Sequence, residues 1–130
     1  MGAWGTGAFD NDDASDWVYE LEKDGLAAVE SALTAAHGPG ELEVPTDVNA
    51  IAAGEVVAAA VGRPVADLRE DILELAIGLA SSVTPEHVSR ARTAIERVAA
   101  GSEIAELWGE SDDEDEWRGL VQDLIRRLSA

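Results

Sequence analysis

Apolar residues recur at intervals of three and four along almost the whole chain after residue 13, and this spacing constrains the fold more than any other feature. Alanine, leucine and glutamate dominate. The alternation of β-branched and polar residues that marks half-buried strands is nearly absent. We therefore predict an all-α fold, a compact bundle of five to seven helices in which residues 1–130 form a single helical domain.

Glycine and proline positions predict the ends of the first two helices. Residues 13–36 should form two helices, because Gly25 interrupts their apolar spacing. Gly38 should end the second helix in the left-handed conformation, and the proline after it cannot continue the helix. Residues 38–45 should then form an extended connection.

Capping residues predict where the later helices begin. Four further starts are expected near Thr46, Asp67, Thr84 and Ser102. The first of these helices consists largely of alanine and valine, so we expect it to be buried among its neighbours. A loop over residues 109–115 should precede the last helix, which has the most regular apolar spacing.

The chain opens with MGAWGTGAFDNDDASDW, which places glycines among aromatic residues before a run of acids. The glycines lack the spacing of a dinucleotide site, and the nearby aspartates would repel a phosphate. We predict that residues 1–9 form an extended strap that seats aromatic side chains on the bundle and leads into a capped helix. The residues of this structural element are Trp4, Phe9, Asn11, Asp12 and Trp17.

The formal net charge of -18 is the strongest global feature of the composition. It is concentrated at both ends, with -7 over residues 1–36 and -6 over residues 102–130. Such a surface repels phosphate backbones and anionic lipids, so we expect neither nucleic acid nor membranes as partners. A basic protein would be attracted, although acidic surfaces also serve solubility alone.

The chain contains no cysteine, which excludes disulfides, thiolate metal sites and cysteine nucleophiles. No apolar run reaches the length of a membrane helix, and the N-terminus lacks the order of a secretory signal. One lysine stands against eight arginines, and alanine is abundant, which suggests a GC-rich bacterial genome. We expect a cytoplasmic bacterial protein.

A group of four aspartates near the N-terminus could supply oxygen ligands to a divalent cation. These weak metal candidates are Asp10, Asp12, Asp13 and Asp16. An EF-hand loop counted from Asp10 would need glycine and glutamate where Ser15 and Leu21 stand. Helix capping explains the same residues more simply, so a cation-binding or weakly catalytic carboxylate site is the alternative function.

A second acidic run lies between two tryptophans near the C-terminus. The partner-binding candidates are Trp108, Asp112, Asp113, Glu114, Asp115, Glu116 and Trp117. The acids are typical of a solvated linker and first helical turn, and the tryptophans of a contact between two helices. An exposed tryptophan beside such acids would instead serve as an interface anchor.

No pattern in the sequence indicates catalysis. His37 and His87 lie at helix ends and outside metal-binding motifs, and no serine lies in a nucleophile elbow. We predict no cofactor and a non-enzymatic, protein-binding module, of which an immunity-like protein or a mimic of nucleic-acid charge are specific versions. Two acids from different helices could still meet in space and perform acid–base catalysis, which the sequence does not exclude. The oligomeric state is not predicted.

The opening string resembles that of a bacterial family described as domain of unknown function 4259. Further segments that resemble this family are AGEVVAAAVGRP at 53–64 and ELWGES at 106–111, followed by Glu116 and Trp117. The resemblance covers nearly the whole chain and implies small, acidic, mostly helical proteins without known catalytic residues. Gly54 stands where the family more often has alanine, which predicts a locally looser helix.

Overall fold

The computed structural model describes residues 5–129, so the expectation for Trp4 lies outside the described residues. Seven helices account for most of this range, and no β-sheet is present within it. The helices are α1 (Asp12–Asp24), α2 (Leu26–Ala36), α3 (Thr46–Ala60), α4 (Glu70–Leu79), α5 (Pro85–Ala100), α6 (Glu103–Gly109) and α7 (Glu114–Ser129). The predicted all-α bundle is confirmed. Within residues 5–129, no helix has both the length and the apolar character needed to cross a membrane.

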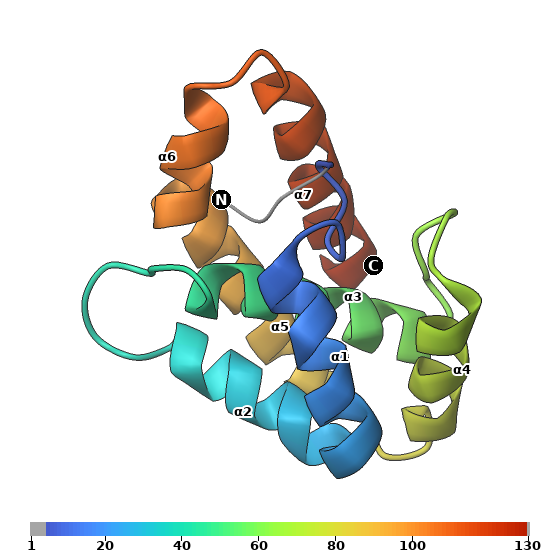
Figure 1. Cartoon of the computed structure of the whole chain (residues 1–130). Coiled ribbons are helices and arrows are strands. Elements are labelled where there is room, and N and C mark those ends of the chain that lie inside the picture. Colours follow the sequence, from blue (N-terminus) through green and yellow to red (C-terminus); the bar gives the residue numbers. More distant parts are fainter. Residues whose placement is uncertain (1–4, 130) are drawn as a thin grey trace.

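Helix α3 forms the centre of the bundle and contacts each of the other six helices (Figure 1). Every residue from Ala50 to Ala60 is buried, as expected for a helix that is apolar on all sides. Its small side chains let α2 and α5 pack closely against it. The core therefore surrounds α3.

The break between α1 and α2 lies at Gly25, as predicted. Its backbone has a φ of 59°, a left-handed value that disfavours side chains, and its N–H donates to the carbonyl of Leu21 at 2.8 Å. At the other end of α1, the side chain of Asn11 accepts the N–H of Ala14 at 2.8 Å. The buried Trp17 then fixes the helix to the core.

Two of the other predicted capping residues, Thr84 and Ser102, are N-caps. Thr84 forms a capping box with His87, whose other ring nitrogen lies 2.9 Å from Glu30 on α2. Ser102 accepts the N–H of Ala105 and is fully buried. These caps determine where α5 and α6 begin.

Gly38 does not end α2 in the left-handed conformation, so that prediction was wrong. The cap residue is His37, whose Nδ1 lies 3.0 Å from the carbonyl oxygen of Leu33. Arg97 on α5 donates to the carbonyl of Ala36 as well. Backbone N–H groups of His37 and Gly38 already bond the carbonyls of Thr34 and Ala35, at 3.1 and 3.2 Å. The two side chains bond the neighbouring carbonyls, so the end of α2 is satisfied without a left-handed glycine.

Asp67 does not cap α4, which begins three residues later after Arg69. A turn closed by the N–H of Leu68 and the carbonyl of Val65 at 3.2 Å comes first. Leu68 is half-buried against the core, whereas Asp67 is exposed. Because this turn packs against the core, α4 begins later in the sequence than predicted.

Gly54 does not loosen α3. A Cβ atom there would lie 3.1 Å from Cδ1 of Ile95 and 3.3 Å from Cδ2 of Leu124. Both neighbours are fully buried on α5 and α7. The glycine therefore permits close approach of three helices, and the predicted looseness is replaced by tight packing.

The connection before α7 is shorter than the predicted loop over 109–115. Gly109 ends α6 and Glu114 begins α7, so only residues 110–113 lie between the helices. Acidic side chains are favourable in a first helical turn, which explains why α7 includes part of the acidic run. Its buried residues are Trp117, Val121, Leu124 and Leu128.

Candidate functional site

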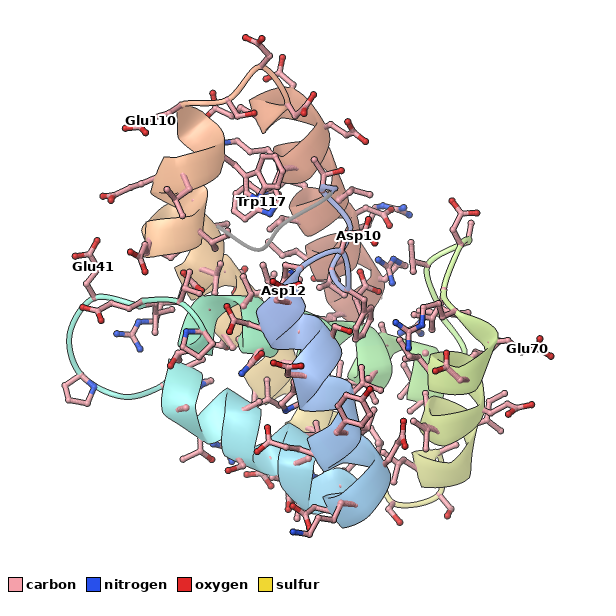
Figure 2. All side chains as sticks on the ribbon, in the orientation of Figure 1. Asp10, Asp12, Glu41, Glu70, Glu110 and Trp117 are labelled. Atoms are coloured by element: carbon pink, nitrogen blue, oxygen red, sulfur yellow. The ribbon has the colours of Figure 1, made fainter. Side chains whose placement is uncertain are left out.

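Residues 110–116, which we call the acidic tip, form the turn between α6 and α7 and the start of α7. The side chains of Glu110, Asp112, Asp113, Asp115 and Glu116 are exposed. Glu114 is half-buried and pairs with Arg118 at 3.1 Å. Figure 2 shows Glu110 projecting away from the bundle at this end. The tip therefore presents closely spaced carboxylates to solvent.

The two tryptophans beside the tip face inward. Trp108 and Trp117 are 9% and 3% exposed, and Trp117 lies between α6 and α7 in Figure 2. The guanidinium carbon of Arg118 lies 5.7 Å from the centre of the Trp117 ring. The tryptophans form a core contact beneath the tip, so the exposed carboxylates are its outward-facing groups.

The opening segment is held against this part of the molecule by Asp10. Its N–H donates to the carbonyl of Gly7 at 3.0 Å, and its Oδ2 accepts the N–H of Gly7 at 3.2 Å. A Cβ atom on Gly5 or Gly7 would lie only 2.7 or 2.6 Å from that Oδ2. The hydroxyl of Thr6 donates to Oε1 of Glu116 at 3.0 Å, which joins the segment to α7.

The four aspartates of the proposed cation site have separate positions. Asp10 is bound to its own loop, and Asp12 and Asp13 belong to the first turn of α1, where the helix N-terminus favours negative charge. Asp12 and Asp16 are exposed. Among residues 5–129, no group of three histidine, aspartate or glutamate side chains is arranged to hold a metal ion.

A cleft of about 310 Å³ lies between the opening segment, α3, α6, α7 and the turn at 65–69. Its apolar lining is Phe9, Val48, Ile51, Val65, Leu68, Ile104, Trp108, Trp117, Leu120 and Val121. Its charged lining is Asp10, Glu55, Asp67, Arg69 and Glu116. Asp10 and Trp117, both labelled in Figure 2, line this cleft together. An apolar floor thus meets a mainly acidic border.

Glu55 extends from α3 and forms a buried ion pair with Arg127 of α7. The two guanidinium contacts measure 2.9 and 3.0 Å, and the side chains are 6% and 10% exposed. Arg127 also donates to Asp123 at 2.8 Å, a hydrogen bond that lowers the pKa of Asp123. Both oxygens of Glu55 are therefore engaged behind the cleft.

Asp47 is a second buried carboxylate and joins the starts of two helices. Its oxygens accept the N–H of Val48 at 2.7 Å and of Ile104 at 2.8 Å. Burial raises the pKa of Asp47 to about 6, with a smaller contribution from the charge of Glu103. This contact fixes α6, and with it Ile104 in the lining of the cleft, relative to α3.

Comparison with known proteins gives one match. The family model described as "Domain of unknown function (DUF4259)" matches residues 2–119, nearly the whole chain. The chain belongs to the DUF4259 family. No curated protein and no solved structure matches it.

The match to DUF4259 includes every segment that lines the cleft except the part of α7 beyond Gly119. Within this DUF4259 chain, the expected strap residue Phe9 is buried, and Asn11 caps α1 as predicted. The cleft itself was not predicted. Its lining comes from five distant segments, and only the clustering of tryptophan and acid near residues 108–117 signalled it.

Proposed function

We propose that this DUF4259 protein is a non-enzymatic binding module whose acidic tip engages a basic protein. The observation that carries the proposal is the imbalance between free and engaged charges. Closely spaced carboxylates at the tip are exposed, whereas most of the nine basic side chains donate to groups of the same molecule. Arg97, for example, donates to the carbonyls of Ala36 and Gly40.

Complementary charge would accelerate the encounter with a cationic partner and repel nucleic acids and anionic membranes. We accordingly propose no nucleic-acid or membrane partner. Absence of cysteine supports a cytoplasmic location, and the arginine and alanine bias supports a bacterial source. An immunity-like role against a basic toxin, or mimicry of nucleic-acid charge, would be specific forms of this activity.

The test measures whether the immobilised protein retains a basic protein from native lysate at about 0.05 M and about 0.5 M salt. The electrostatic screening length falls several-fold over this range. Wild-type protein is compared with a tip variant, Glu110→Gln, Asp112→Asn, Asp113→Asn and Asp115→Asn. The matched control removes four exposed charges elsewhere, by Glu70→Gln, Glu74→Gln, Glu86→Gln and Glu96→Gln.

We expect wild type and control to retain the same basic protein at low salt, and the tip variant to lose it. High salt should release it from the wild type and from the control. Retention of no basic protein by the wild type would contradict the proposal, and equal losses from the two variants would exclude the tip as the binding surface.

A further inference from the structure

We propose that the cleft beside the acidic tip receives an arginine side chain of the basic partner. This inference rests on the proposed function, because it specifies how such a partner is recognised. The tip and the cleft share Glu116, and Trp108 and Trp117 line the cleft directly below the tip. A partner held at the tip would therefore lie next to the cleft opening.

The volume of the cleft limits what it can hold. Binding sites for drug-sized ligands occupy roughly 300–1,000 Å³, and this cleft of about 310 Å³ lies at the lower limit. The cleft, as lined by the described residues, therefore has room for one long side chain and a small group next to it. A dinucleotide or a similarly large cofactor would not fit.

The charges around the cleft favour a cation. Asp67 is exposed without a hydrogen-bond partner in residues 5–129, and Glu116 uses only Oε1 in its bond with Thr6. The positive group in the lining, Arg69, is bound through Nε and Nη2 to Asp71. Glu55 is already neutralised by Arg127, and Asp10 is bound through Oδ2 to the N–H of Gly7. Asp67 and Glu116 are therefore the exposed carboxylates that can receive a cation.

Arginine fits this combination better than lysine does. Its long stem can lie along apolar residues such as Leu68 and Leu120, while its planar guanidinium can donate to two carboxylates at once. A guanidinium is also attracted to the face of an indole ring. Arg118 beside Trp117, at 5.7 Å, is an example of that contact within the molecule.

The probe is the peptide acetyl-Leu-Arg-Leu-amide, titrated against the full chain while tryptophan fluorescence is recorded. Its counterpart contains citrulline, which has the shape of arginine without the charge. We expect a saturable change with the arginine peptide and binding at least about tenfold weaker with citrulline, because a charged hydrogen bond is lost. Absence of saturable arginine binding, or equal affinities, would overturn the inference.

Two charge-matched variants separate the cleft from the general acidity of the surface. Asp67→Asn with Glu116→Gln removes the two exposed carboxylates of the cleft, and Glu41→Gln with Glu70→Gln removes two that project from other parts of the molecule (Figure 2). We expect about tenfold weaker arginine binding in the first variant and at most about a twofold change in the second.

Equal weakening in both variants would overturn the cleft site, since the peptide would then respond only to net charge. All four substituted side chains are exposed, so folding should be retained, and the melting temperature checks this. Failure of the peptide experiment alone leaves the proposed function intact when a basic protein is still retained through the tip. Failure of that retention experiment contradicts the proposed function itself.

Discussion

The carboxylate of Asp47 accepts the N–H of Ile104 at 2.8 Å, so one fully buried side chain connects the first turns of α3 and α6. The pKa of Asp47 is raised to about 6 from its ordinary value of 3.8, mainly because burial disfavours its charge. The folded protein therefore holds this proton more tightly than the unfolded chain does. The stabilisation is complete below the unfolded pKa and is lost as pH rises through the folded pKa.

We predict that titration of Asp47 reduces the free energy of unfolding by about 1 kcal/mol between roughly pH 5 and pH 7.5. Urea unfolding at both values measures the total change, and Asp47→Asn, which cannot titrate, removes this part of it. Carbon NMR of the Asp47 carboxyl gives an independent check. A midpoint near pH 4 would show that the site does not hold the proton as described.

Replacing Gly54 with alanine should be more favourable when Ile95 is shortened than in the wild type. Alanine improves helix propensity by about 1 kcal/mol, but its methyl group would crowd Cδ1 of Ile95. Ile95→Val removes Cδ1 but keeps the contacts with Cγ1 of residue 95 and Cδ2 of Leu124, at 3.2 and 3.3 Å. We therefore expect Gly54→Ala to add less than about 1 kcal/mol in that background and still less in the wild type. Chemical unfolding of the four proteins measures this coupling, and identical effects in both backgrounds would argue against the contact.

Gly7→Ala should lower the free energy of unfolding by about 1–2 kcal/mol, because the new Cβ would collide with Oδ2 of Asp10. In an Asp10→Ala background the collision is absent, and the same substitution should cost less than about 0.5 kcal/mol. Thermal unfolding of the four proteins tests the pair. An undiminished cost without Asp10 would mean that the glycine is required for another reason.

Glu55→Gln should destabilise the protein by about 2–4 kcal/mol, because it leaves Arg127 buried with reduced compensation. Arg126→Gln is the control, since Arg126 is 75% exposed and should change stability by less than about 0.5 kcal/mol. Urea unfolding compares the two variants. Similar small effects would indicate that the buried pair contributes little.

Calorimetry with calcium, magnesium and manganese tests the alternative function at the N-terminal aspartates. Because Asp10 is bound to its own loop and Asp12 lies in a first helical turn, we expect heats equal to those of dilution. A saturable heat of binding would favour a cation site instead, provided that the double variant Asp12→Asn with Asp16→Asn abolishes it.

Local signals in the sequence predicted much of the helical framework. Gly25 breaks the first helical segment, and Thr84 and Ser102 cap later helices, because each acts on the few residues that follow it. The predictions for Gly38 and Asp67 failed where tertiary contacts decided the outcome. Arg97 satisfies the end of α2 from α5, and burial of a neighbouring leucine delays α4.

The candidate site depended more strongly on distant contacts. Acidity at 110–116 was evident from the sequence, but the pairing of Glu55 with Arg127 joins residues far apart in the chain. The cleft likewise combines Asp67 and Glu116 with an apolar floor from several helices. No short-range pattern specifies such combinations, so they emerge only when the helices are packed.

Amide NMR during titration with an arginine-rich peptide tests most directly whether the acidic tip and its adjoining cleft form the binding surface. We predict shifts concentrated in residues 65–69 and 110–121, with Trp117 among the most affected, and reversal at high salt. Shifts spread evenly over the exposed carboxylates of α1, α4 and α5, or no shifts at all, would contradict this account.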